Sequence, residues 1–214
     1  MTVVSKLSNP ALLPRTPAPQ FLVFIRHGET DWNAEGRMQG QRDIPLNVKG
    51  LSQAAENGRR LRGYFEDEAV SPKSLDFVAS PLGRTRHTMD LVRRELGMDN
   101  KSYRTDPRLM ELTFGAWEGF TLQELAKDVP DKVAERRNDK WRFTPPGGES
   151  YEMLRQRIEP WLAEVNRPTV VVSHGGVFRV IRGLLEGLAT DAVPKLDTPQ
   201  DRVFVWRDSS GTWL

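Results

Sequence analysis

The sequence predicts a single α/β domain of three layers, in which helices cover both faces of a mostly parallel central sheet. Short apolar segments typical of buried strands alternate with segments whose apolar residues recur at helical spacing. Three of these strands, at 21–25, 75–80 and 168–172, run directly into polar side chains. In parallel sheets, ligands bind beyond the carboxyl ends of the strands, so the sequence also predicts a site at one edge of the sheet.

The first part of the chain predicts an arm, a strand and a helix. Residues 1–20 are rich in proline and indicate a flexible N-terminal arm, after which residues 21–214 form one domain. FLVFI, at 21–25, is the first strand. Apolar residues near helical spacing predict a helix over 50–65, which Asn47 is placed to cap.

The rest of the domain alternates in the same way. Thr121, with Glu124 three residues later, predicts the cap of a short helix. The charged segment 126–148 ends in TPPGG and predicts a loop or mobile lid, within a lid-like insertion of about 120–149. In chain order we expect a strand at 75–80, a helix at 82–96, an extended piece at 102–111, a helix at 121–129, a helix at 149–165 kinked at Pro160, a strand from 168, a helix at 177–188 and a strand at 202–208.

Composition excludes several classes of protein. The chain has 214 residues, a net charge of +2 and no cysteine, which excludes disulfides, zinc–thiolate sites and a cysteine nucleophile. No apolar run approaches the roughly 20 residues of a membrane helix, and residues 1–20 lack the apolar core of a secretory signal. Acidic residues are mixed among the basic ones, whereas a nucleic-acid-binding protein more often shows a basic stripe. We therefore expect a cytoplasmic protein whose partners include neither nucleic acid nor a membrane, and we leave its oligomeric state open.

Two histidines and two arginines follow the predicted strands. His27 and His174 each stand between an apolar strand and a glycine, and neutral imidazole is both a nucleophile and a proton carrier near neutral pH. Arg26 and Arg84 offer planar forks of donors that suit a phosphate dianion. This combination is what phosphoryl transfer through a histidine requires, because one imidazole attacks phosphorus while cations hold its oxygens.

Glycines and a carboxylate complete the predicted site. Gly28, Gly175 and Gly176 allow backbone N–H groups to approach an anion closely. Glu111 is a candidate acid for the leaving oxygen. Neither HExxH nor GxxxxGKS occurs in the sequence, and we expect no metal and no cofactor.

Each of these residues also has an ordinary structural interpretation. A single histidine after a strand is more often structural than catalytic, but two on matching strand ends favour function. Taken alone, Arg84 is equally consistent with a solvated surface charge. His87 is interpreted as a helix residue at the surface or behind the site, and Glu118 as an exposed carboxylate.

Five segments carry a resemblance to a known family. RHGETDWN at 26–33, GRMQGQRDIPLNVKG after it, SPLGRTRHT, RLMELTFGAWEGF and VSHGG are similar to motifs of the histidine phosphatase superfamily, over about residues 21–207. The family includes cofactor-dependent phosphoglycerate mutases and broad-specificity phosphatases. Two positions depart from its pattern: Asn47 stands where threonine is usual, and His87 where glutamine is common.

The resemblance implies a phosphoglycerate mutase-like fold and a role for each matching residue. His27 resembles the phosphorylated nucleophile, Glu111 the proton donor, and Arg26, Arg84 and His174 the phosphate pocket. Glu29 is expected to orient its loop rather than to act in the chemistry. The expected substrate-binding residues are Gly28, Glu29, Thr30, Asn33, Gln39, Gly40 and Gly175.

The implied reaction is hydrolysis of a phosphomonoester of a small metabolite through a phosphohistidine. The PPGGES ending of the modest lid favours a phosphatase. A mutase stays open as the alternative, because Arg136, Arg137, Lys140 and Arg142 in the lid could bind a carboxylate or a second phosphate; a solvated helix face is their ordinary interpretation. A binding module without turnover is a remote alternative, since all four of His27, Arg84, Glu111 and His174 are present.

Overall fold

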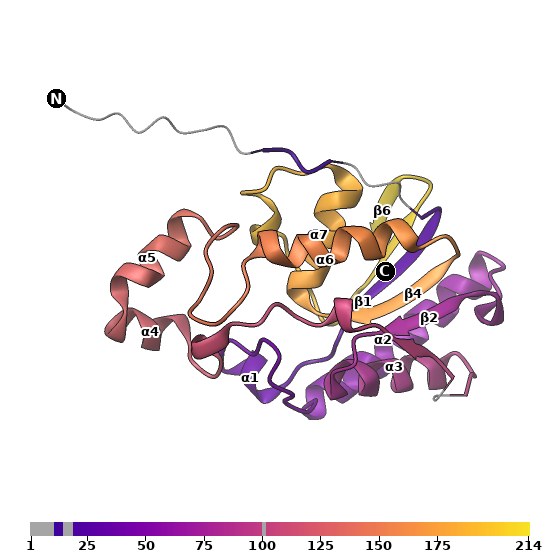
Figure 1. The fold of residues 1–214 in the computed structure, drawn as a ribbon. Helices are drawn as coiled ribbons and strands as arrows, with labels where there is room; N and C mark the ends of the chain where they lie inside the picture. The colour runs from indigo at the N-terminus through magenta and orange to yellow at the C-terminus, as the bar shows by residue number, and fades with distance from the viewer. Residues whose placement is uncertain (1–10, 15–18, 100–101) are drawn as a thin grey trace.

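The computed structural model describes residues 11–14, 19–99 and 102–214 and confirms the predicted α/β class (Figure 1). Six strands form one sheet in the order β3-β2-β4-β1-β5-β6. The pairs β1–β4, β4–β2 and β2–β3 are parallel, whereas β5 is antiparallel to both β1 and β6. The strands are β1 Phe21–Arg26, β2 Asp76–Ala79, β3 Arg104–Thr105, β4 Thr169–Ser173, β5 Val203–Arg207 and β6 Ser210–Trp213.

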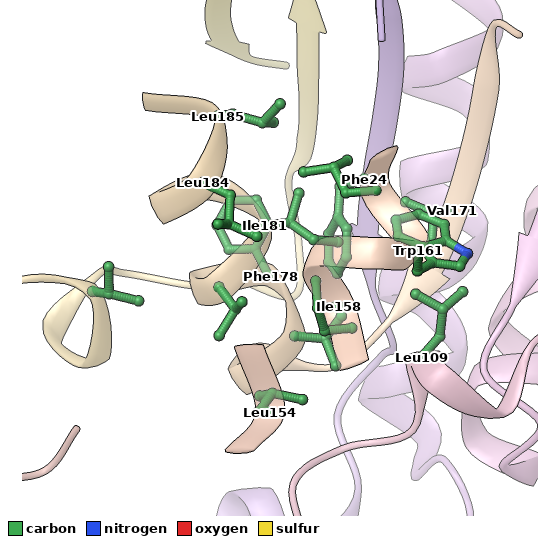
Figure 2. Close-up of a cluster of buried hydrophobic side chains, with 14 of the residues drawn as sticks. Phe24, Leu109, Leu154, Ile158, Trp161, Val171, Phe178, Ile181, Leu184 and Leu185 are labelled. Atoms are coloured by element: carbon green, nitrogen blue, oxygen red, sulfur yellow. The ribbon is translucent and has the colours of Figure 1, made fainter. Parts of the chain in front are cut away.

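Two pairs of helices cover the two faces of the sheet. Helices α6 (Tyr151–Glu164) and α7 (Gly175–Glu186) pack on one face, where Figure 2 shows Trp161 and Phe178 beside Phe24 and Val171 of the strands. On the other face, α2 (Val48–Asp67) and α3 (Gly83–Glu95) bury their apolar sides against alternate residues of the same strands. Both faces of the central strands are therefore covered, which is why these strands are almost wholly apolar in sequence.

The caps expected from sequence are present. Asn47 begins α2, and its side chain accepts a hydrogen bond from the Gly50 backbone N–H at 2.8 Å. Thr121 and Glu124 form a capping box at α4 (Leu122–Asp128). The remaining elements are α1 (Asp31–Ala34), α5 (Pro130–Asn138) and the 3₁₀ turns Pro72–Ser74, Pro107–Leu109, Gly115–Trp117 and Val193–Lys195.

The loop predicted over 126–148 is wrong for its first part, because α5 occupies Pro130–Asn138. Pro130 stands at the first position of this helix, where its missing N–H costs nothing. Val133 is the one buried residue of α5 and packs in a small core of its own with Met38, Trp117 and Leu125. Helices α4 and α5 thus project from one end of the sheet (Figure 1).

Three other features differ from expectation or add to it. Strand β6 was not predicted; Asp208 and Ser209, both at positive φ, turn the chain back from β5. Pro160 lies inside α6, which continues to Glu164. Among the described residues, no helix has both the length and the apolar character needed to cross a membrane.

Part of the predicted N-terminal arm packs on the domain. The Leu13 backbone N–H donates to the Leu188 carbonyl at 3.0 Å, and the Leu13 side chain is buried beside α7. Residues 11–14 of the predicted arm therefore lie against the domain. Residues 1–10 and 15–18, to which the prediction also applies, lie outside the described residues.

Candidate active site

The register of β1 and β4 brings the two histidines together. Arg26 pairs with Ser173, and the His27 backbone N–H donates to the Ser173 carbonyl at 3.0 Å. His27 and His174, each one residue past its strand, therefore lie side by side, with ring centroids 5.2 Å apart. Both rings are buried. Their proximity agrees with the expectation that side chains at the carboxyl ends of these strands lie together.

His27 is held with one ring nitrogen free of its proton. Its Nδ1 lies 2.8 Å from the Gly28 carbonyl, to which it can only donate, so Nε2 carries the lone pair. Burial, and then the positive charges of Arg84 and Arg26, hold the pKa of His27 well below its usual value. The imidazole is therefore neutral at physiological pH, as a nitrogen nucleophile must be.

Arg84 is buried between the two imidazoles. Its Nε donates to His27 Nε2 at 3.3 Å, and its Nη2 to His174 Nδ1 at 3.2 Å. The guanidinium also donates to the carbonyls of Gly40 and Arg42 at 2.7 and 2.6 Å. Burial lowers its pKa to about 10, so it stays charged at neutral pH. A solvated surface charge is thus excluded for Arg84.

His174 takes the opposite tautomer to His27. Because Nδ1 accepts from Arg84, its Nε2 carries the proton and donates to Ser80 Oγ at 2.8 Å. Burial, followed by the charge of Arg84, holds the pKa of His174 well below its usual value. Ser80, at the end of β2, thereby fixes the ring.

Arg26 is the last residue of β1, and its side chain lies near Thr198 and Gly175. Its Nη1 donates to the Thr198 carbonyl at 2.7 Å, while its Nε is buried without a hydrogen-bond partner among the described residues. Burial, and then the nearby charge of Arg179, lower its pKa to about 10. A Cβ at Gly175 would lie 3.4 Å from Arg26 Nε and 3.5 Å from Arg179 Nη1, so both guanidinium groups flank this glycine.

Glu111 is fixed by the backbone around it. Its carboxylate accepts from the backbone N–H groups of Leu112 at 3.1 Å and Gly176 at 3.0 Å. A Cβ at Gly176 would lie 2.4 Å from the Glu111 carboxylate, so that position needs glycine. The anion that the Gly176 N–H approaches is thus the chain's own carboxylate.

A cavity of about 170 Å³ joins these groups. Predicted residues that line it are His27, Asn33, Gln39, Gly40, Arg84 and Glu111, and Arg37, Met38 and Phe114 complete the wall. Gln39 Oε1 is buried there without a partner among the described residues. The volume of the cavity suits the phosphorylated end of a small molecule.

The other predicted residues stand behind this wall. Thr30 Oγ1 accepts from Gln39 Nε2 at 2.7 Å, and the Gly28 N–H donates to Thr88. A Cβ at Gly28 would lie 2.2 Å from the Gly50 carbonyl oxygen, so close packing on α2 explains this glycine. The Glu29 carboxylate binds Lys49 Nζ at 2.7 Å and Asn47, turned toward α2.

Glu118 differs from its ordinary interpretation, whereas His87 matches it. The Glu118 side chain is only 9% exposed, and its carboxylate accepts from the Gln41 backbone N–H and the Thr113 hydroxyl. The exposed carboxylate expected there is wrong, because Glu118 joins two loops of the site. His87 is exposed, in agreement with a surface role.

Gln200 is a site residue that the sequence did not reveal. Its Nε2 donates at 3.0 Å to both the His27 carbonyl and Asn33 Oδ1. It belongs to an irregular segment that also carries Thr198, the partner of Arg26. No pattern of spacing marks such a residue in the sequence.

A second group of cations lies beside Arg26, and we call Arg136, Lys140 and Arg179 the cationic wall. Arg179 contacts the Tyr151 hydroxyl at 3.3 Å, and Lys140 Nζ lies 5.8 Å from the Tyr151 ring. Burial, together with the charges of Arg136 and Arg179, lowers the pKa of Lys140 to about 8. Within the described residues, no carboxylate forms an ion pair with any of the three.

The four lid cations named from sequence therefore divide into two pairs. Arg136 and Lys140 belong to the cationic wall, whereas Arg137 and Arg142 are exposed, with Arg142 paired to Asp139. In the part of the chain that the structure describes, no cluster of three or more histidine, cysteine or acidic side chains is arranged to hold a metal ion.

Comparisons with known proteins agree with this geometry. A family model described as "Histidine phosphatase superfamily (branch 1)" matches residues 22–213. A Salmonella paratyphi C protein named "Probable phosphoglycerate mutase GpmB" is 34% identical over 179 residues, 81% of this chain and 78% of that protein. The Arabidopsis thaliana 6-phosphofructo-2-kinase/fructose-2,6-bisphosphatase is 30% identical over 86% of this chain, which matches only 23% of that longer protein. The structure of mycobacterial glucosyl-3-phosphoglycerate phosphatase with VO3 aligns with a TM-score of 0.74 and 29% identity, covering 91% of this chain and 96% of that one.

Proposed function

This chain belongs to the histidine phosphatase superfamily, branch 1, and on that premise we propose that it is a phosphomonoester hydrolase acting on a small phosphorylated metabolite through a phosphohistidine. The observation that carries the proposal is one cavity lined by three residues: His27, whose Nε2 is unprotonated, the buried Arg84, and Glu111. A nucleophile, a fixed cation and a proton carrier thus face the same small space.

In the first step, His27 Nε2 attacks phosphorus and the ester P–O bond breaks. Arg26 and Arg84 hold the phosphoryl oxygens, His174 keeps the Arg84 guanidinium in place through its Nδ1, and protonated Glu111 gives its proton to the departing alkoxide. In the second step, the Glu111 carboxylate takes a proton from water, whose oxygen attacks phosphorus as the P–N bond breaks. Inorganic phosphate leaves, and both His27 and Glu111 return to their starting states.

The cationic wall supports a substrate with a second anionic group. Within the described ranges, Arg136, Lys140 and Arg179 have no carboxylate partner, and both Arg179 and Arg26 lie beside Gly175. The three side chains are half-buried, and Lys140 and Arg179 donate to the backbone carbonyls of Pro194 and Leu196. A concentration of positive charge of this kind favours an anionic ligand. The names of the relatives above concern phosphoglycerates or a sugar bisphosphate, each of which bears a carboxylate or a second phosphate beside the ester.

Neutralising the inner pair of lid cations should separate acidic from neutral substrates. We expect the double variant Arg136→Gln, Lys140→Gln to raise KM for 3-phosphoglycerate about ten-fold or more, since charged hydrogen bonds contribute about 1.5–3 kcal/mol each. KM for p-nitrophenyl phosphate should barely change. As the pKa of Lys140 is about 8, the KM of the unmodified enzyme for the acidic substrate should also rise as the pH passes about 8 and the lysine loses its charge.

The matched control for this prediction is Arg137→Gln, Arg142→Gln, which removes the same charge from exposed positions of the same insertion. Both KM values should stay near those of the unmodified enzyme. Equal effects of the two double variants on both substrates would refute a dedicated anion site.

Activity should not depend on an added divalent ion. The positive charge that faces the phosphoryl group comes from arginine and histidine side chains, which can supply the stabilisation that other phosphatases obtain from metals. Phosphate release from p-nitrophenyl phosphate should therefore survive dialysis against EDTA. A loss that magnesium or zinc restores would contradict the mechanism.

A phosphoglycerate mutase is the second candidate, favoured by the cationic wall and by the mutase relative. A mutase returns the phosphoryl group from histidine to a second hydroxyl of the substrate instead of to water. The two functions are distinguished by primed reactions with 2,3-bisphosphoglycerate present. Interconversion of 3- and 2-phosphoglycerate faster than phosphate release would favour the mutase.

A further inference from the structure

The segment that carries Glu111 is irregular in conformation. Between the 3₁₀ turns Pro107–Leu109 and Gly115–Trp117, Glu111 and its neighbours belong to no helix or strand. No repeating ladder of backbone hydrogen bonds therefore fixes the position of the Glu111 carboxyl group. Proton transfer requires the donor within hydrogen-bond reach of the leaving oxygen, so something else must hold this segment.

Arg157, on α6, binds the backbone of this segment. Its Nη1 donates to the carbonyls of Arg108 and Met110, the latter at 2.7 Å, and its Nη2 donates to the Glu111 carbonyl at 3.1 Å. One rigid guanidinium thus satisfies three carbonyls within four residues. A planar fork of donors with fixed geometry transmits its own position to the groups that it binds.

Glu149 links Arg157 to Thr113, which follows Glu111 in the chain. Its two carboxylate oxygens accept from Arg157 Nε at 3.2 Å and Nη2 at 3.1 Å. Glu149 also accepts from the Thr113 backbone N–H at 3.1 Å, and its own N–H donates to the Thr113 carbonyl at 2.8 Å. The pair therefore holds the backbone both before and after Glu111.

Other contacts hold the same segment at single points, among them the Gly176 backbone N–H, which donates to the Glu111 carboxylate at 3.0 Å. Ser173 Oγ donates to the Leu109 carbonyl at 2.7 Å, and Gln41 Nε2 donates to the Glu111 carbonyl at 3.0 Å. Neither residue spans the segment as Arg157 does. Loss of Arg157 would leave carbonyls unsatisfied and free the Glu111 backbone to shift.

We propose that Arg157, supported by Glu149, is a positioning residue that sets the Glu111 carboxyl group where it can protonate the leaving oxygen. The proposal rests on the function proposed above, in which Glu111 is that acid. It has a specific consequence. Alkyl phosphates release a strongly basic alkoxide that needs the proton, whereas p-nitrophenyl phosphate releases a weakly basic phenolate that does not.

The test compares kcat/KM for glycerol 3-phosphate with that for p-nitrophenyl phosphate, because kcat/KM reports formation of the phosphohistidine and not its hydrolysis. Since general acid catalysis contributes about 10²–10⁴-fold, Arg157→Met should lower the alkyl value about ten-fold or more and the aryl value about three-fold at most. Glu149→Gln should shift the ratio in the same direction by less. Arg155→Met removes an arginine of the same helix that pairs with Glu159, and should leave the ratio unchanged.

Two further variants make the outcome decisive. Arg157→Lys keeps the charge and the fold but cannot bind three carbonyls, so it should also lower the alkyl-to-aryl ratio. Glu111→Gln removes the proposed acid itself and should therefore lower the alkyl-to-aryl ratio of kcat/KM. If Glu111→Gln lowers the ratio but Arg157→Lys, Arg157→Met and Glu149→Gln lower both substrates equally or not at all, the positioning role is wrong and the proposed function stands. If Glu111→Gln leaves the ratio unchanged, the assigned acid is wrong, and the positioning role is wrong with it.

Discussion

His27→Ala should lower turnover of every phosphomonoester by about three orders of magnitude or more while leaving the fold intact. The substitution removes the only imidazole among the described residues that line the cavity. His174 cannot substitute, because it is not among the residues that line the cavity and its Nε2 carries a proton that it donates to Ser80. Phosphate release from p-nitrophenyl phosphate measures turnover. Thermal unfolding measures whether the fold is intact.

The covalent intermediate gives a second measurement of the same prediction. Enzyme quenched in denaturant during turnover should carry a phosphoryl group that is labile in acid, stable in base and located on His27. His87→Ala is the matched control, since His87 is an exposed histidine of α3. Near-normal activity of His27→Ala would overturn the phosphohistidine mechanism and would favour a non-covalent role for the pocket.

The histidines and arginines of the site could be placed from sequence because they follow strands whose pairing is set by apolar patterning. Once β1 and β4 are adjacent and parallel, the pairing of Arg26 with Ser173 brings His27 beside His174. Arg84 was grouped with them because it follows the strand at 75–80 and has a guanidinium that suits a phosphate, and the family resemblance supports the same grouping. Its position one residue into α3 does not by itself distinguish a buried fork from a surface charge.

Features that depend on tertiary packing were missed. Helix α5 buries a single apolar residue, Val133, so it lacks the stripe that marks an amphipathic helix. Arg136 and Arg137 are adjacent and chemically identical, and only the orientation of α5 decides which is partly buried. Gln200 lies 173 residues from His27, whose carbonyl it binds, and no periodicity connects them.

Glu118 illustrates the same limit for a charged residue. Carboxylates are seldom buried, which made exposure the reasonable expectation. In the structure its carboxylate accepts from the Gln41 and Phe114 backbone N–H groups and from the Thr113 hydroxyl, and it lies 3.4 Å from Arg42. These partners come from two loops whose approach follows from the assembled fold.

Arg84→Met should produce the second largest loss, because Arg84 serves the phosphoryl group and both imidazoles. Each charged hydrogen bond to a phosphoryl oxygen contributes about 1.5–3 kcal/mol, so loss of a two-pronged contact should lower kcat/KM by about two to four orders of magnitude. Arg84→Lys should lose less, since it keeps the charge but not the fork. Arg94→Met, at an exposed position of the same helix, should have little effect.

The pH dependence separates the electrostatic part of this loss from the geometric part. Burial and then the charge of Arg84 lower the pKa of His27, so the imidazole is neutral down to acidic pH. Removing that charge raises this pKa, and the nucleophile becomes protonated at a higher pH than before. The acidic limb of the kcat/KM profile should therefore move to higher pH in Arg84→Met and stay in place in Arg84→Lys. A limb that moves to lower pH in Arg84→Met, or moves equally in both variants, would mean that the charge of Arg84 does not keep His27 ready to attack.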